Sequence, residues 1–266
     1  MISVTDLDAL RAHLPSASGE TAVLAWQLGQ QADSIASAFL LGYQLALRQV
    51  DNGLQAGELA AFCVSEKGLA SLSAMSCSVA NGRLNGQKSH VMLMQPIALD
   101  WLYVLARQHE DLVLVKVAAQ AQGIQPQAPL PQPFVPQVSH CPLVFDQVVI
   151  EDDFFLSDAH QRANKPFRYW EDVHVTLAVA GWLFKRVDNG QAVLEACERL
   201  IDHFAAQPER YDAAGLDAVE QCLQQMSDMA NQLTEESERQ QWQRDQAIML
   251  LSSRARQALR KQFSAR

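Results

Sequence analysis

The segment F-C-V-S-E-K-G-L-A-S-L spans residues Phe62 to Leu72. Its first three residues are apolar, and small polar residues and Gly68 follow closely. A short apolar run that ends in turn-forming residues is typical of a buried strand that enters a tight loop. The segment therefore predicts the beginning of a β-rich region.

The sequence remains β-rich as far as residue 150. Two Asn-Gly pairs, Asn81-Gly82 and Asn85-Gly86, each favour a type I′ turn, because both residue types accept positive φ angles. We therefore expect a chain reversal between short strands at each pair. Runs rich in β-branched, aromatic and other apolar residues add further strands, at 91–94, 101–106, 112–117 and 142–150. Five or six strands predict an antiparallel β-domain, with the Pro- and Gln-rich stretch 125–136 as an extended surface loop.

Helical sequence precedes this region. Residues 3–13 predict a short helix with Thr5 as its N-cap. From Glu20 to Val50 apolar residues recur at helical spacing, and Asp33 or Ser34 can restart the helix after a break.

Helical sequence also follows the β-region. A polar linker is expected at 158–165, and then four amphipathic segments predict an up-down bundle, at 167–187, 191–204, 216–234 and 238–262. The chain is therefore predicted to have an α+β fold of three parts: a short N-terminal helical region (1–60), a central antiparallel β-domain (61–157) and a C-terminal helical bundle (158–266).

Composition narrows the function classes. The chain has 266 residues, of which 48% are hydrophobic and 19% charged, enough for a sizeable core. A net charge of −9 argues against nucleic-acid binding, which needs a surplus of Lys and Arg.

The odd number of cysteines, five, without a C-x-x-C pair predicts reduced core thiols. No leader sequence or membrane-length apolar run is found, so a cytoplasmic protein without a membrane span is expected. The seven scattered histidines predict no metal site.

Four segments resemble those of the acyl-CoA dehydrogenase family, in the same order and at similar spacing. Residues 62–72 resemble its Y-C-x-T-E-P-G-A-G-S-D segment, and 85–92 (N-G-Q-K-S-H-V-M) its N-G-x-K-x-W-I-T strand. Residues 100–107 resemble A-D-x-x-x-V-x-A-R, and 139–150 resemble S-x-T-x-x-V-F-x-D-V-x-V-P. The resemblance implies the family's fold, with a shortened N-terminal helical region, and assembly as a homodimer. It also implies FAD-dependent oxidation of acyl-CoA thioesters.

The resemblance points to residues at the flavin. Ser65 matches a threonine that contacts the flavin ring and Ser71 matches a serine that contacts phosphate, although the residues alone equally favour two turn serines. Ala70 replaces the second glycine of the motif. His90 and Met92 stand where the family has Trp and a hydroxyl residue, so stacking area and a hydrogen-bond donor are lost.

The phosphate-facing positions are also changed. Arg210 lies one residue out of register with the Arg of the family's R-x-x-F-G segment, and its position favours an ordinary surface arginine over a phosphate contact. Glu220 stands at the position of a phosphate-facing Gln, where like charges repel. We therefore expect FAD binding to be weak or absent.

A catalytic base is not evident at its usual place. The family's base follows a Gly-Gly and an R-D segment, and no Gly-rich turn or Glu follows Arg244-Asp245 up to Gln262. Some members carry the base on the first bundle helix.

Near that position stand Glu171, Asp172 and His174. Glu171 and His174 are three residues apart, so they could form an acid–base pair on one helix face. The alternative is an acidic helix N-terminus with a solvated histidine.

Two functions therefore remain open. The first is a flavin-dependent oxidoreductase acting on acyl-CoA thioesters. The second is a non-catalytic relative that serves protein association or binds an acyl-CoA-like ligand. The flavin absorbance of the purified protein distinguishes them.

Overall fold

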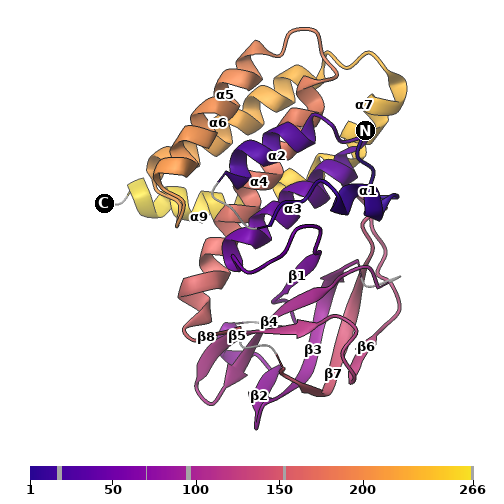
Figure 1. Cartoon of the computed structure of the whole chain (residues 1–266). Coiled ribbons are helices and arrows are strands. Elements are labelled where there is room, and N and C mark those ends of the chain that lie inside the picture. Colours follow the sequence, from indigo (N-terminus) through magenta and orange to yellow (C-terminus); the bar gives the residue numbers. More distant parts are fainter. Residues whose placement is uncertain (17–19, 70, 94–96, 152–153, 265–266) are drawn as a thin grey trace. The chain divides into compact units, whose positions relative to one another are not determined.

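The computed structural model describes residues 1–16, 20–69, 71–93, 97–151 and 154–264, so Ala70 and Met94 lie outside the described residues (Figure 1). The chain forms two compact units. A helical unit comprises residues 1–57, 133–137 and 167–266. A β-unit comprises residues 58–132 and 138–166.

The β-unit is built on one sheet in the strand order β6-β7-β3-β2-β4-β5-β8, with β1 paired to β4. Its strands are β1 Ala60–Cys63, β2 Ser78–Ala80, β3 Arg83–Met92, β4 Trp101–Gln108, β5 Asp111–Ala118, β6 Ile124–Pro126, β7 His140–Val149 and β8 Phe155–Leu156. Pairing is antiparallel except that β1 runs parallel to β4 and β2 meets β4 at one parallel bridge. A long connection separates β1 from β4 along the chain, and such a connection permits parallel pairing where a hairpin does not. The sheet is therefore mixed rather than purely antiparallel.

The two Asn-Gly pairs have different roles. Asn81 (φ 50°) and Gly82 (φ 69°) join β2 to β3 as a two-residue turn, as predicted. The predicted reversal at Asn85-Gly86 is wrong, because both residues lie inside β3. Gly86 (φ 126°) marks a β-bulge against β7, and a Cβ there would lie 2.5 Å from the Cα of Cys77. Close backbone approach, rather than a turn, explains this glycine.

The helices of the chain are α1 Leu7–Arg11, α2 Thr21–Gly29, α3 Ile35–Val50, α4 Lys165–Phe184, α5 Gln191–Ala206, α6 Ala213–Ala230, α7 Glu236–Asp245, α8 Ala247–Leu250 and α9 Ser253–Ser264. The N-cap of α1 is Asp6 rather than Thr5, since its Oδ1 accepts from the backbone N–H of Ala9 at 3.0 Å. Ser34 caps α3 as predicted. The expected polar linker is instead a π-helical turn, His160–Asn164, that continues into α4. The predicted fourth bundle helix is divided into α7, α8 and α9. The predicted α+β fold is confirmed.

Three glycines allow α2 and α3 to lie very close to α4. An ideal Cβ on Gly29 would lie 2.1 Å from the carbonyl oxygen of Ala178, and one on Gly181 would lie 2.4 Å from that of Trp26. On α3, a Cβ on Gly42 would lie 2.7 Å from the carbonyl oxygen of His174. Larger side chains would therefore separate these helices. α4 is the central helix of its unit, with an unbroken buried run from Asp172 to Leu183.

The predicted surface loop at 125–136 begins as β6 and ends in the helical unit. Val135 is buried at φ 41°, and its N–H donates to Oδ1 of Asp245 at 2.7 Å. The buried Asp245 carboxylate also accepts two hydrogen bonds from Arg244, each 2.7 Å long. Asp245, at the end of α7, therefore holds a segment that lies between β6 and β7 along the chain.

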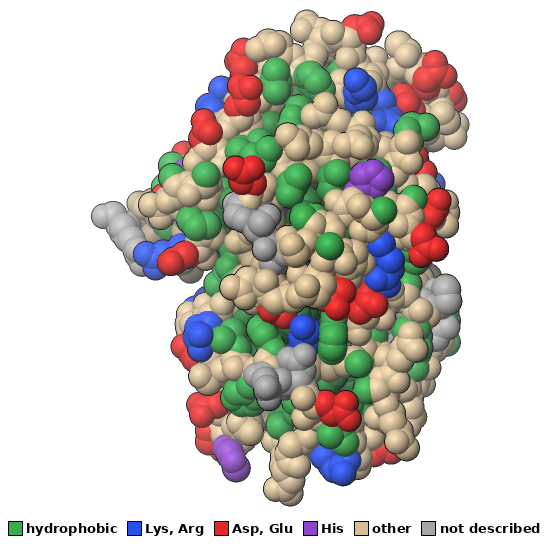
Figure 2. Space-filling model, in the orientation of Figure 1, with side chains coloured by type: hydrophobic (Ala, Val, Ile, Leu, Met, Phe, Trp, Pro, Cys, Tyr) green, Lys and Arg blue, Asp and Glu red, His purple; other side chains and the backbone are tan. Residues whose placement is uncertain are grey.

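Surface charge is mixed. Figure 2 shows Lys and Arg side chains interspersed with Asp and Glu over the visible face of the described residues. Among those residues, no helix combines the length and the hydropathy that crossing a membrane requires.

Candidate functional site

The loop after β1 is held by a buried ion pair. Lys88 on β3 is fully buried, and its Nζ donates to Glu66 Oε1 at 3.0 Å and to the Val64 carbonyl oxygen at 3.1 Å. Glu66 Oε2 accepts from both the backbone N–H and the hydroxyl of Ser76 at 2.7 Å, and Oε1 accepts from the N–H of Cys77 at 3.1 Å. Burial raises the pKa of Glu66, but the hydrogen bonds from Ser76 and Lys88 outweigh it and hold the pKa below its ordinary value. Glu66 is therefore an ionised structural anchor.

Ser65 and Ser71 lie on this anchored loop, and both are exposed. The backbone carbonyl of Ser65 accepts from the N–H of Ser89 at 2.8 Å, which joins the loop to β3. The hydroxyl of Ser71 lies 2.7 Å from that of Ser73. Ser65 is therefore fixed through its backbone, and Ser71 makes a local contact at the start of a short 3₁₀ turn, Leu72–Ala74.

His90 and Met92 lie close together on β3 but differ in exposure. His90 is exposed, and its Nδ1 lies 3.0 Å from the hydroxyl of the adjacent Ser89. Met92 is buried. The register of β3 against β7 shifts between Lys88 and Val91, so strict alternation of the two faces is lost here. The structure therefore places one polar ring and one thioether where the resemblance implies a stacking ring and a donor.

His174 is fully buried in the helical unit, and both of its ring nitrogens have partners. Nδ1 lies 2.6 Å from the carbonyl oxygen of Trp170, so Nδ1 carries the proton. Nε2 lies 2.8 Å from the hydroxyl of Thr21, which donates to it and also accepts from Gln49 at 2.7 Å. Burial lowers the pKa of His174 to about 4, so the ring is neutral. Of the two alternatives for His174, the pair with Glu171 is not formed, because both ring nitrogens have other partners, and the ring is buried rather than solvated.

Asp172 is buried and belongs to a second network. Arg256 on α9 donates from Nη1 to both carboxylate oxygens, at 2.6 and 2.8 Å, and from Nη2 to the Met249 carbonyl oxygen at 2.8 Å. The hydroxyl of Tyr211 donates to Oδ2. Burial raises the pKa of Asp172, while Arg256 and Tyr211 act in the opposite direction. Arg256 therefore joins α9 to a carboxylate on α4.

Glu171 differs from its two neighbours. Its side chain is half-buried, and burial followed by the charge of Asp172 raises its pKa to about 7. Arg168 acts against this shift. A carboxylate with a pKa near neutrality is suited to accept and release protons at physiological pH. The protonation of Glu171 can therefore change in that range, whereas the ring of His174 stays neutral there.

The remaining candidates lie at the α5–α6 end and on α6. Arg210 is exposed in the loop between these helices. Glu220 on α6 accepts from Arg260 on α9, and Asp217 accepts from the same guanidinium. The negative charge of Glu220 is therefore offset by Arg260.

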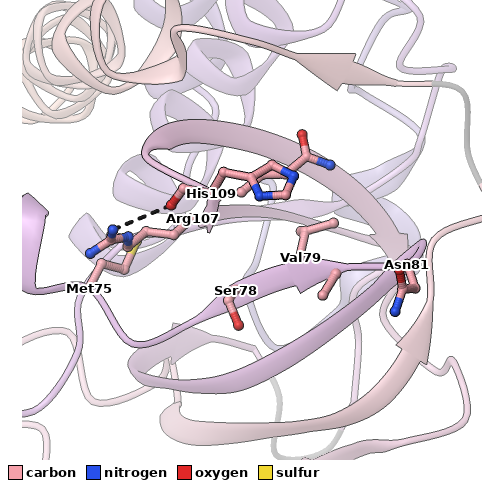
Figure 3. Close-up of a pocket in the computed structure, with 8 residues that line it drawn as sticks. Met75, Ser78, Val79, Asn81, Arg107 and His109 are labelled. Atoms are coloured by element: carbon pink, nitrogen blue, oxygen red, sulfur yellow. Dashed lines mark hydrogen bonds between the residues drawn. The ribbon is translucent and has the colours of Figure 1, made fainter.

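A pocket of about 390 Å³ opens in the β-unit where β2 and β4 diverge beyond their single bridge (Figure 3). Its lining comes from β2, the residues on either side of it, the end of β4 and the turn that follows β4: Met75, Ser78, Val79, Ala80, Asn81, Arg107, Gln108 and His109. The Arg107 guanidinium donates to the carbonyl oxygens of Ser73 at 2.7 Å and His109 at 3.3 Å, the latter drawn dashed in Figure 3. Its cation therefore stabilises the neighbouring turns.

The whole chain resembles several solved structures. Butyryl-CoA dehydrogenase from Megasphaera elsdenii superposes with a TM-score of 0.69 over 92% of this chain and 81% of that chain, at 13% identity. The apo form of PigA gives 0.69 over 100% and 89%, at 13% identity. The prolyl acyl carrier protein oxidase AnaB gives 0.67 over 98% and 89%, at 12% identity. This chain has the acyl-CoA dehydrogenase fold. No protein-family model and no curated protein matches the sequence.

The acyl-CoA dehydrogenase fold permits a test of how well the matched positions suit FAD. Ser65 and Ser71 offer exposed hydroxyls, but Met92 offers no donor, and Glu220 offers an anion already paired with Arg260. His90 is exposed and offers a smaller ring than Trp. These residues do not fit a tightly held FAD. Among the described residues, no three His, Cys, Asp or Glu side chains gather as metal ligands would.

Sequence reasoning missed the anchors of the site. Glu66 and Lys88 match the Glu and Lys of two of the family's motifs, and this match could have pointed to them as partners. The partnerships of Asp172 with Tyr211 and Arg256 join distant parts of the chain and had no signal in local spacing.

Proposed function

We propose that this chain is an acyl-CoA dehydrogenase-type protein that does not hold FAD tightly. It acts by association, with an acyl-CoA-like ligand or a protein partner, and not by flavin-dependent oxidation. The observation that carries the proposal is that polar groups at the positions matching the family's site already have hydrogen-bond partners within the chain. Both ring nitrogens of His174 and both carboxylate oxygens of Asp172 have structural partners, and Glu220 is paired with Arg260.

The size of the expected defect follows from the replaced contacts. A hydrogen bond to a charged group contributes about 1.5–3 kcal/mol, and every ~1.4 kcal/mol changes affinity tenfold. The strand hydroxyl, the stacking ring and the phosphate-facing amide are replaced by Met92, His90 and Glu220. The loss of two hydrogen-bonding groups, together with the loss of stacking area, weakens FAD binding by several orders of magnitude.

Calorimetry of the purified chain with FAD tests the proposal, together with the absorbance of the protein as isolated. We expect a colourless protein and binding weaker than micromolar. The double variant His90→Trp with Met92→Thr should recover weak binding, whereas the exposed control Ser237→Ala, on α7, should leave the titration unchanged. A yellow preparation with stoichiometric flavin, or a micromolar or tighter dissociation constant for the native chain, would overturn the proposal.

A second candidate function is flavin-dependent oxidation of an acyl-CoA thioester with Glu171 as the base. It is favoured by the pKa of Glu171, which burial and Asp172 raise to about 7. Such a carboxylate would accept the proton from the carbon next to the thioester. The test is turnover of acyl-CoA substrates by the protein supplied with excess FAD and an electron acceptor. Activity that Glu171→Gln abolishes, and that Glu195→Gln leaves intact, would favour this candidate.

Self-association belongs to the main proposal. We propose that the chain forms a homodimer, as the family resemblance implies. Sedimentation velocity at micromolar concentration measures this directly. A single monomeric species across the concentration range would contradict a homodimer without bearing on FAD binding.

A further inference from the structure

Two cysteines meet between α5 and α6. The Sγ atoms of Cys197 and Cys222 lie 3.5 Å apart, and both side chains are fully buried. Neither cysteine is in a disulfide. The two thiols are therefore in direct contact, with one donating weakly to the other.

The α5–α6 interface is closely packed beyond this contact as well. In the antiparallel pair, His203 on α5 lies opposite Gly215 on α6, about two helical turns from the cysteines. A Cβ on Gly215 would lie 2.5 Å from Nε2 of His203. Packed helices usually lie about 8–10 Å apart, whereas a disulfide needs Cα atoms within roughly 4.4–6.8 Å. Gly215 therefore makes room for the His203 ring. The 3.5 Å separation of the Sγ atoms shows that α5 and α6 approach closely enough at Cys197 and Cys222 for the two sulfurs to meet.

We propose that Cys197 and Cys222 form a disulfide that joins α5 to α6 when the protein meets a peroxide. In the first step a thiolate attacks one peroxide oxygen, the O–O bond breaks, and a sulfenic acid and one water form. In the second step the other thiol attacks that sulfur, the S–S bond forms, and a second water leaves. Two electrons pass from the sulfurs to the peroxide, and the two thiol protons end in water.

The surroundings of the two cysteines determine how fast the disulfide forms and which part of the helical unit it stabilises. Burial raises the pKa of the Cys197 thiol well above its ordinary value, so attack on peroxide waits for local opening of the helix pair. The disulfide closes a loop that contains the α5–α6 turn. That turn contacts α4, because Trp170 Nε1 donates to the Pro208 carbonyl oxygen at 2.6 Å and Tyr169 donates to that of Gln207 at 3.2 Å. Crosslinking therefore stabilises the part of the helical unit that carries Glu171.

The test is peptide mapping of the full chain after peroxide treatment, without a reducing agent. We expect a linked pair of peptides containing Cys197 and Cys222, lighter than their sum by the mass of two hydrogen atoms. Because the closed loop is of moderate length, the melting temperature should rise by roughly 5–10 °C and fall back on reduction.

Three variants provide the controls. Cys222→Ala and Cys197→Ala should each abolish the rise in melting temperature, and either alone suffices if the other misfolds. Cys141→Ala, in the β-unit, should retain it. The proposal is overturned by absence of the linked peptides, by Cys197 recovered as sulfinic acid, or by a rise that persists in both α5–α6 variants.

Discussion

Replacing Arg256 by Met should destabilise the helical unit more than any surface change on the same helix. Met preserves much of the length of the side chain but removes the guanidinium. In the native chain that group donates from Nη1 to both oxygens of Asp172, and from Nη2 to the carbonyl oxygen of Met249. After the change, Asp172 remains buried with only Tyr211 among these strong partners.

The magnitude follows from the burial of both partners. The side chains of Arg256 and Asp172 are 5% and 6% exposed, so solvent cannot compensate for the lost charge. Removing one member of a buried pair costs about 3–5 kcal/mol, because it leaves an uncompensated charge. The cost should shrink as the pH falls, since protonation of Asp172 removes that charge. The double variant that adds Asp172→Asn should recover part of the loss at neutral pH.

Urea unfolding followed by tryptophan fluorescence measures the effect. Of the five tryptophans, Trp26, Trp170, Trp182 and Trp242 lie in the helical unit, so the signal reports mainly on it. The matched control is Arg254→Met, an exposed position on the same helix, where we expect less than about 0.5 kcal/mol. A loss below about 1 kcal/mol for Arg256→Met would refute the reasoning, as would a loss that does not depend on pH.

Three further predictions concern other buried groups. Lys88→Met should cost about 3 kcal/mol by leaving Glu66 unpaired, whereas the exposed Lys67→Met should cost little; urea unfolding of both variants measures the difference. The pKa of His174 is lowered to about 4, so stability should be complete above pH 6.5 and fall by about 3 kcal/mol as the pH drops toward 4; His174→Gln should flatten that slope in pH-dependent melting. Gly181→Ala should cost about 1–3 kcal/mol through overpacking, seen as a lower urea midpoint.

The sequence correctly predicted features that depend only on neighbouring residues, such as a tight turn and a helix cap. Asn81-Gly82 supplied positive φ angles where a two-residue turn needs them, and Ser34 capped α3. The same dipeptide at Asn85-Gly86 does not form a turn, because its glycine is needed for close approach to the backbone of Cys77, just before β2. An Asn-Gly pair shows that the backbone can adopt positive φ angles at that point. It does not show whether a turn or a close backbone contact requires the glycine.

The candidate site was less predictable, because its partners are distant in sequence. Spacing placed Glu171 and His174 on one helix face, yet His174 bonds to Thr21 on α2. Asp172 and Arg256 are 84 residues apart, and no local pattern pairs them. The predicted last helix is divided, and Arg256 of α9 donates back to the carbonyl oxygen of Met249 in α8.

The glycine contacts of α2 and α3 with α4 also bear on how the chain is synthesised. Gly29 faces Ala178, so more than half of the chain length separates the two sides of that contact. During translation, α2 and α3 emerge with apolar faces long before α4 exists, and the whole β-unit is made in between. Contacts of such long range slow folding and prolong the exposure of apolar surface. Ribosome-bound chains that stop before α4 should therefore be protease-sensitive in their first fifty residues, and should become resistant once α4 has left the exit tunnel.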